Sequence, residues 1–396
     1  MKKILIVGAG FLQDFVIRRA VEDGFETLAI DANPNAVGFT HASKHAVINI
    51  VDEKACLEYA ESENIDGVLT AATDFGVLTA AYIAREMGLP GLNYDSASLV
   101  KNKYHLRKCF FENRIDDSDQ AYEVNADTNI HQIANQLKYP VMVKPCDGSG
   151  SRGASRVNSP DELEKACMYA ISSSYSRSAE IESFIKGHEY GAESLVVDGE
   201  VHVLGIMKKW MTNPPSYAEL GHALPCGLPY WVEKKARSLI ERAIHALGIN
   251  HGSVNMDMII TEDGKVHIID VGARMGGNLI GPFIIPYGTG IDYVGNVIKN
   301  AVGEPLDWSV KEKRPVATRL LAFDNGTINA IPDISSLEKE YNVEIFHHME
   351  TGMKVNEYQT NLDGLGYVVA TDNELTKAIN NAEAVVNIFK KKCFQS

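Results

Sequence analysis

The first hundred residues alternate between short apolar runs and longer stretches in which apolar residues recur at helical spacing. The apolar runs stand at residues 4–7, 27–31, 46–50 and 67–71, and the helical patterns lie at about 11–23, 53–63 and 75–88. Strands that alternate with helices predict a parallel sheet covered on both faces. Residues 1–100 are therefore expected to form a Rossmann-like α/β domain.

Beyond residue 100 the pattern changes. A helix is predicted at about 101–113, and strands at 140–145 and 179–184 flank a helix that begins near Pro160. Two hairpins are predicted to turn at residues 198–199 and 262–264, separated by a helix at 229–248. This antiparallel content predicts an α+β domain over residues 101–311. Residues 312–396, with short strands and a final helix at about 373–391, are expected to form a C-terminal lobe.

Charge and composition narrow the class of partner. The chain has 396 residues, with 38 Lys and Arg against 52 Asp and Glu, a net charge of −14. Such a chain lacks a general attraction for nucleic acid or anionic membranes, so neither is an expected partner. No apolar run is long enough to cross a membrane, and the start of the chain reads as a strand. Six scattered cysteines fit a reducing cytoplasm, which is the expected location.

The segment GAGFLQ, residues 8–13, follows the first strand and precedes the first helix. It supplies two glycines of a dinucleotide-binding fingerprint, but Gln13 stands where a third Gly or Ala belongs. Asp31 ends the second strand, about where a ribose-binding acid would lie. The segment is therefore either an NAD site, or a tight strand-to-helix turn that binds no ligand or a different one, and the second interpretation is favoured.

A second loop is richer in small polar residues. The apolar strand at 140–145 contains Lys144 and leads into Gly148, Ser149, Gly150, Ser151, Arg152 and Gly153. Small residues let backbone N–H groups approach phosphate oxygens closely. The loop is not a Walker A motif, because its lysine precedes the glycines. A flexible loop without a ligand would have similar composition, but a lysine on an apolar strand needs an anionic partner, which a nucleotide phosphate would supply.

The hairpin at residues 253–277 carries two acids. If its turn is centred on residues 262–263, Asp257 pairs with Ile268, and Asp270 lies diagonally from Asp257 on the same face. The two Cβ atoms would be roughly 7 Å apart, a span that Mg²⁺ can bridge. A register shift of one residue would place them on opposite faces. Alternatively, one acid caps a turn and the other is paired. Arg274 follows, placed to neutralise phosphate charge.

In this order the motifs resemble the ATP-grasp superfamily of carboxylate–amine ligases, and most closely the L-amino acid ligases. Residues 73–76 (TDFG) and 89–93 (LPGLN) are similar to the first domains of carbamoyl phosphate synthase and of purine-pathway members. The resemblance implies an ATP-grasp fold: a Rossmann-like domain, a central clamp with a small mobile subdomain at about 115–185, and a C-terminal lobe. It also implies a reaction. A carboxylate, expected to be that of an amino acid, attacks the γ-phosphate of Mg·ATP, and an amine displaces phosphate from the acyl phosphate.

The resemblance assigns roles residue by residue. Lys103 and Lys144 would contact ATP phosphates, residues 148–153 would close over them, and Glu189 would bind the ribose. Adenine would meet Glu182, Ser183, Phe184 and Ile185. Asp257 and Asp270 would hold Mg²⁺ or Mn²⁺, while Arg274 and Lys144 would serve catalysis. Substrates would contact Asp74, Lys208, His222 and Asn278.

Gly272 departs from the family pattern, because many members have there an Asn that is a third metal ligand. A water or Asn278 could replace it, so the number of metals stays open. A homodimer is expected only at the level of the superfamily.

Three other functions stay open. A ligase of the same superfamily could use another small carboxylate, in purine-type or carbamoyl-phosphate-type chemistry. An NAD-dependent oxidoreductase would rest on residues 8–13, but it leaves residues 144–153 and 257–274 unexplained. A nucleotide-binding protein without catalysis is the third, and the substitution at Gly272 makes it conceivable. No motif identifies the carboxylate or the amine.

Overall fold

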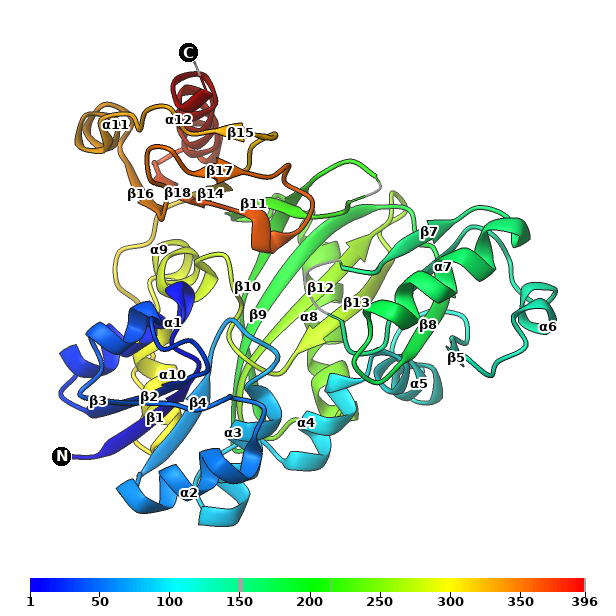
Figure 1. The fold of residues 1–396 in the computed structure, drawn as a ribbon, viewed down its shortest axis with the longest axis horizontal. Helices are drawn as coiled ribbons and strands as arrows, with labels where there is room; N and C mark the ends of the chain where they lie inside the picture. Colours follow the sequence, from blue (N-terminus) through cyan, green and yellow to red (C-terminus); the bar gives the residue numbers. More distant parts are fainter. Residues whose placement is uncertain (149–151, 215, 395–396) are drawn as a thin grey trace.

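The computed structural model describes residues 1–148, 152–214 and 216–394. The N-terminal region is a four-stranded parallel sheet, at the lower left of Figure 1, with the strand order β3-β2-β1-β4. Its elements are β1 (Lys3–Val7), α1 (Phe11–Glu22), β2 (Glu26–Asp31), η1 (Val37–Thr40), β3 (Lys44–Val47), α2 (Glu53–Glu63), β4 (Gly67–Thr70) and α3 (Val77–Met87). Strand β3 lies earlier than the predicted 46–50, because Ile48 and Ile50 pack onto the core from the following loop.

The segment GAGFLQ forms a tight turn between β1 and α1. Gly8 has a φ of 102°, which favours glycine. The Asp31 carboxylate accepts a hydrogen bond from the Ala9 N–H at 2.9 Å, and the Gln13 side chain donates to the Ala71 carbonyl at 2.5 Å. The acid that would bind a ribose is thus bonded to the loop itself, which agrees with the favoured interpretation as a turn.

The helix predicted at 101–113 is two helices, α4 (Tyr94–Lys101) and α5 (Lys103–Glu112). Asn102 separates them because its backbone is extended and its side chain caps α5, accepting from the His105 N–H at 3.0 Å. Because of this break, Lys101 is the last residue of α4 and Lys103 is the first residue of α5.

The large central sheet has eight strands in the order β13-β12-β9-β10-β11-β14-β18-β16. Its strands are β9 (His188–Val197), β10 (Glu200–Met211), β11 (Glu219–Leu224), β12 (Gly252–Ile260), β13 (Val266–Gly272), β14 (Val316–Leu320), β16 (Val343–His347) and β18 (Gly366–Thr371). The predicted hairpin turns at 198–199 and 262–264 are both present. The sheet continues past residue 311 into the expected C-terminal lobe, so that lobe is joined to the clamp by strand pairing.

Helices cover both faces of this sheet. Helix α8 (Tyr230–Ala246) packs its apolar side on β10 and β13, in a core that includes Ile240 and Ile268. The other face meets η2 (Ile280–Ile284), α9 (Ile285–Thr289) and α10 (Tyr293–Ala301), and α10 also contacts β4 of the N-terminal sheet. In the C-terminal lobe, α12 (Leu375–Phe394) packs on β14 and β18. The remaining elements there are β15 (Gly326–Thr327), α11 (Ile334–Tyr341), β17 (Lys354–Val355) and η3 (Asn361–Asp363).

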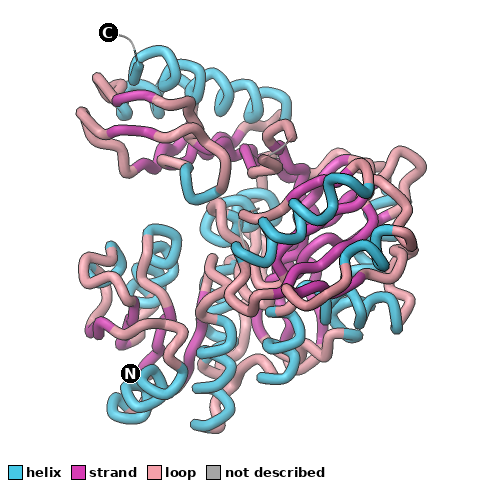
Figure 2. The backbone as a smooth tube through the Cα atoms, turned by 45° about the vertical axis from the view of Figure 1, so that its right-hand side comes forward, coloured by secondary structure: helices cyan, strands magenta, loops and turns pink. Residues whose placement is uncertain are grey.

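A second, smaller antiparallel sheet lies beside the large one, at the right of Figures 1 and 2. Its strand order is β5-β8-β6-β7. Its elements are β5 (Tyr122–Asn125), α6 (Ile130–Ala134), β6 (Val141–Pro145), β7 (Ser155–Val157), α7 (Pro160–Ser173) and β8 (Ser178–Ser183). Helices α6 and α7 pack on it around a core of its own, which includes Val143, Leu163 and Ile181. The two sheets thus face each other as separately packed bodies.

The described residues contain no helix that is both long and apolar enough to cross a membrane. All six cysteines are buried and unpaired, and burial raises the pKa of Cys146 to about 12.

Candidate active site

Asp257 and Asp270 lie directly opposite each other on β12 and β13. The predicted register is wrong by one residue at the turn, because Ile260 pairs with Val266 and not with Lys265. A shift of that size would separate the acids, but the register changes again between Asp257 and Met258. Ile269 is the extra residue of this β-bulge. The bulge returns both carboxylates to one side, where they line the same two cavities.

The bulge also leaves the Ile269 carbonyl outside the strand pairing, where it accepts hydrogen bonds from two cationic side chains of other elements. The Ile269 carbonyl accepts hydrogen bonds from Lys144 Nζ and from Arg107 Nη2, each at 3.3 Å. Arg107 is fully buried and donates a second bond, of 2.7 Å, to the Ile268 carbonyl. Because Lys144 lies on β6 and Ile269 on β13, this contact connects the small sheet to the large one.

The predicted phosphate lysines lie on either side of these strands. Lys103 Nζ forms an ion pair with Asp270, and the Lys103 N–H donates to the Cys146 carbonyl at 2.7 Å. Lys144 is buried and its Nζ lies 2.6 Å from Glu182 Oε1. Both ammonium groups thus reach the same region from different elements.

Lys144 has a second acidic neighbour, Glu180, whose Oε2 lies 3.8 Å away. Burial raises the pKa of Glu180 to about 7, and among the described residues neither of its carboxylate oxygens has a hydrogen-bond partner. Burial acts in the same direction on Glu182, but the nearby Lys144 and Arg107 outweigh it and lower the pKa of that carboxyl. Lys144 therefore contacts a buried pair of acids in which Glu182 ionises at lower pH than Glu180.

A cavity of about 200 Å³ lies between the two sheets. It brings together most of the residues predicted to bind a nucleotide. These are Lys103, Lys144, Gly148, Arg152, Glu182, Ser183, Phe184, Ile185, Glu189, Asp257 and Asp270. Gly153 is buried beside it with a φ of 80°, and an added Cβ would lie 2.6 Å from Pro145. Ser149, Gly150 and Ser151 lie outside the described residues.

One end of this cavity is apolar and the other is charged. Phe184 and Ile185 form the apolar end with Met142, Met211 and Ile259. The Phe184 N–H donates to the Pro140 carbonyl at 3.1 Å, which fixes the strand end that follows β8. The charged end holds the lysines and aspartates. An apolar slot that leads to cations suits a flat ring attached to phosphates.

The principal cation that the sequence did not reveal is Lys209 on β10. Only 1% of its side chain is exposed, and its Nζ contacts Glu219 Oε1 at 2.5 Å and Asp257 Oδ1 at 2.7 Å. A third carboxylate, that of Glu189, lies 3.9 Å away. These acids raise the pKa of Lys209 although burial opposes them, and burial raises the pKa of Glu189 to about 7.

The predicted substrate residue Lys208 is exposed and extends over the Trp210 ring, 5.1 Å from its centroid. Neighbouring residues of a strand point to opposite faces, so the lysine that reaches the cavity is Lys209 and not Lys208. His222 pairs with Lys209 across β10 and β11 but lines neither cavity. Burial lowers the pKa of His222 to about 4, which keeps the ring neutral at pH 7.

The other two predicted substrate residues have protein partners. Asp74 Oδ1 lies 2.9 Å from Arg274 Nη2. The Asn278 amide donates to Glu219, and its Oδ1 accepts from the Tyr367 hydroxyl at 3.1 Å. Asn278 therefore contacts the Lys209 cluster and the C-terminal lobe, and its amide is not directed to Asp257 or Asp270.

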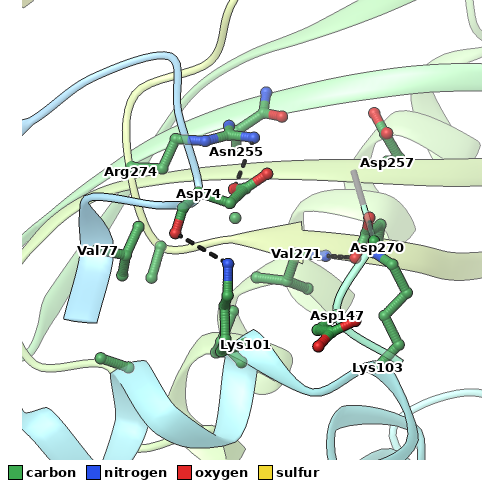
Figure 3. A pocket seen from close by; sticks show the side chains of 15 residues that line it. Asp74, Val77, Lys101, Lys103, Asp147, Asn255, Asp257, Asp270, Val271 and Arg274 are labelled. Atoms are coloured by element: carbon green, nitrogen blue, oxygen red, sulfur yellow. Dashed lines mark hydrogen bonds and ion pairs between the residues drawn. The ribbon is translucent and has the colours of Figure 1, made fainter. Parts of the chain in front are cut away.

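A smaller cavity lies between the N-terminal domain and the β12–β13 hairpin (Figure 3). Its lining contains Asp74, Val77, Ala97, Val100, Lys101, Lys103, Asp147, Gly148, Asn255, Asp257, Asp270, Val271, Gly272, Ala273 and Arg274. Four of these residues, Lys103, Gly148, Asp257 and Asp270, also line the larger cavity. The two cavities therefore meet at the pair of aspartates.

The substitution at Gly272 has a steric reason. A Cβ at this position would lie 2.8 Å from Arg274 Cζ, so the guanidinium packs where a side chain would be. Asn255, directly opposite Gly272 on β12, lines the smaller cavity, and its Nδ2 donates to Glu193 at 2.9 Å. Within residues 1–148, 152–214 and 216–394, no three or more His, Cys, Asp or Glu side chains are arranged to hold a metal. Asp257 and Asp270 are the two acids that line both cavities.

Residues 137–282 match the family model described as an ATP-grasp domain. The chain carries an ATP-grasp domain. A protein of Sinorhizobium fredii, named only as uncharacterized, is 28% identical over 316 residues, which are 78% of this chain. An ATP-grasp enzyme of Aspergillus fumigatus is 29% identical over 50% of the chain. The chain spans 64% of the first relative's length and 35% of the second's.

The whole chain also has the ATP-grasp arrangement of its sheets. The crystal structure of an L-amino acid ligase from Bacillus licheniformis superposes with a TM-score of 0.84 at 22% identity, covering 100% of this chain and 99% of that one. The ATP-grasp fold predicted from the sequence is therefore confirmed. The three-domain division and the roles of the site residues stay predictions.

Proposed function

We propose that the chain is an ADP-forming ligase that activates a small carboxylate, expected to be that of an amino acid, as an acyl phosphate and joins it to an amine. One observation carries the proposal. The larger cavity, with its apolar slot and lysines, meets the smaller one at Lys103, Gly148, Asp257 and Asp270. Two small molecules held in these cavities would therefore have their reacting ends side by side.

The larger cavity is assigned to ATP. Its apolar end takes the adenine beside Phe184 and Ile185, and Glu189, half-buried between the two ends, takes the ribose hydroxyls. Lys144 and Lys103 take the phosphates, where each exchanges a carboxylate partner for a phosphate oxygen. Asp270 would then be free to bind a cation, and Glu182 would keep Arg107, whose Nε lies 3.0 Å from its Oε2.

Asp257 and Asp270 fit a divalent cation. They face each other across one strand pair, and lysines from two other elements now neutralise them. Oxygen ligands of this kind suit Mg²⁺ or Mn²⁺, which would be held between the aspartates and would neutralise phosphate charge.

The chemistry follows from this arrangement. A carboxylate oxygen from the smaller cavity attacks the γ-phosphorus, the bond between this phosphorus and the bridging oxygen breaks, and ADP leaves. An amine then attacks the acyl carbon, the bond between this carbon and the phosphate oxygen breaks, phosphate leaves with the electron pair, and the amine proton passes to phosphate or water. Lys103, Lys144 and Arg274 stabilise the charge that develops on the transferred group, and the surrounding walls exclude water from the acyl phosphate.

The test is ADP and phosphate release from Mg·ATP, screened with the twenty amino acids singly and in pairs, and with formate, bicarbonate and other small acids. Asp270→Asn is the blank, because it removes one cation-binding carboxylate with little change in size. Release that depends on an acid, with a condensed product found by mass spectrometry, supports the ligase. Release with a carboxylate other than an amino acid would favour the alternative ligase. ATP binding without release under any condition would contradict the proposal.

A further inference from the structure

Lys101 differs from the other cations of the smaller cavity. Lys103 is paired with Asp270, and Arg274 is paired with Asp74 at 2.9 Å. Lys101, in contrast, has no carboxylate within ion-pair distance in the part of the chain that the structure describes. Its Nζ donates to the Asp74 backbone carbonyl at 3.3 Å and lies 4.7 Å from the centre of the Phe75 ring.

The position of this ammonium is defined by the break between the two helices. Lys101 is the last residue of α4, and in Figure 3 its side chain rises from the helix into the cavity, toward Asp74. Arg274 lies on the opposite wall in the same view. Burial lowers the pKa of Lys101, as expected where a cation lacks an anion of its own.

The remaining carboxylates of the cavity have other partners. Asp147 accepts hydrogen bonds from the Ser174 hydroxyl at 2.8 Å and from the Ser176 N–H at 2.7 Å, which hold it in its loop. Asp257 is paired with Lys209 at 2.7 Å. Lys101 is thus the cation of this lining that has no carboxylate in contact with it among the described residues, and a ligand with a single carboxylate would supply that partner.

The size of the cavity limits the ligand. Its volume is about 50 Å³, room for roughly four water-sized positions. The apolar members of its lining, beside the charged residues already named, are Val77, Ala97, Val100, Val271 and Ala273. A compact aliphatic skeleton can pack against these apolar side chains, and Lys101 is the cation left to pair with a single carboxylate.

We propose that Lys101 binds the substrate carboxylate in this cavity, and that the substrate is a compact monocarboxylic acid of about the size of propionate or alanine. This inference rests on the proposed function, because it places the acid beside the phosphate end of the ATP cavity. The carboxylate would contact Lys101 on one side and lie near Arg274 on the other. One of its oxygens would then be directed to the region that the two cavities share.

The experiment measures binding without turnover. The protein is saturated with Mg²⁺ and β,γ-methylene-ATP, and propionate and L-alanine are each titrated by calorimetry. Lys101→Met should weaken the binding of the better probe at least about tenfold, because a hydrogen bond to a charged group is lost. Lys101→Arg, which keeps the charge, should restore most of the affinity. Lys108→Met, on the exposed side of α5, is the matched control and should bind as the wild type does.

Equal affinity of Lys101→Met and wild type would overturn the inference, as would the failure of both probes to bind the wild type. These failures differ from a failure of the proposed function. If β,γ-methylene-ATP itself does not bind, both proposals fall. If it binds and ADP release requires a larger or doubly charged acid, the ligase stands and only the assignment of Lys101 and of a compact acid falls.

Discussion

The buried ammonium of Lys209 offers the sharpest test of the electrostatics of the site. It contacts Glu219 at 2.5 Å and Asp257 at 2.7 Å, with Glu189 at 3.9 Å. At an effective dielectric constant of about 20, each of the two short contacts is an attraction of about 6 kcal/mol. Burying the ammonium costs several kcal/mol, so removing one partner of such a buried pair typically destabilises by about 3–5 kcal/mol.

Lys209→Met keeps most of the stem and removes the charge, so we expect the free energy of unfolding to fall by about 3–5 kcal/mol at pH 8. The pKa of Lys209 lies above the 10.5 of an unfolded lysine. Its contribution is therefore full at any pH below that value and is lost only in strong alkali. The change between pH 8 and pH 5 must come from the acids left behind, whose protonation at low pH should make the loss smaller.

The assay is urea unfolding at pH 8 and pH 5, with and without Mg²⁺. The matched control is Lys208→Met, the exposed neighbour on the same strand, which should change stability by less than about 1 kcal/mol. Mg²⁺ should stabilise Lys209→Met more than the wild type, because a cation beside Asp257 then has no competing ammonium. Equal stability of the two variants, or a loss that grows as the pH falls, would refute the reasoning.

Three further outcomes are expected. Lys144→Met should weaken the binding of an ATP analogue at least about tenfold in a fluorescence titration, since a charged hydrogen-bond donor is lost; unchanged affinity would remove Lys144 from the phosphate site. Gly272→Ala would place a Cβ 2.8 Å from Arg274 Cζ, so ADP release should fall about tenfold or more while thermal stability changes little; full activity would show that the guanidinium position is not needed. Burial raises the pKa of Glu180 to about 7 from 4.5, so its ionisation costs stability as the pH rises through that window. Glu180→Gln should therefore gain at most about 3 kcal/mol at pH 8 and nothing below pH 4.5, as unfolding curves at both pH values would reveal.

Residues in contiguous motifs were the easiest to place from the sequence. Glu182, Ser183, Phe184 and Ile185 follow one another at the end of β8, and all four line the larger cavity. Lys144 could also be found from its neighbours in the sequence. A lysine near the end of an apolar strand, followed by a glycine-rich loop, needs an anionic partner close by. The resemblance of one contiguous segment to a known family named the first four residues, and the local pattern of an apolar strand named Lys144, so the tertiary structure only has to bring each segment to the site.

Lys209 could not be found in this way. The strand that carries it has apolar residues on both faces, and Ile206 and Met207 are both fully buried. In a strand covered on both sides the alternation of apolar and polar residues disappears, so it cannot show which of two adjacent lysines faces the cavity. What distinguishes Lys208 from Lys209 is the set of acids on neighbouring strands, and these come from positions far apart in the sequence.

The register that pairs Asp257 with Asp270 is a second feature that the sequence did not predict, although the predicted face of both acids was right. The sequence prediction placed both acids on one face, which is where they lie, but it did so through a register that the structure does not have. The one-residue error at the turn and the bulge at Ile269 cancel, since each moves a side chain to the other face. The bulge is not a defect of the strand, because it exposes the carbonyl that Lys144 and Arg107 share. A regular hairpin would keep that carbonyl in the strand pairing, and the buried Lys144 ammonium would lose one of its oxygen partners.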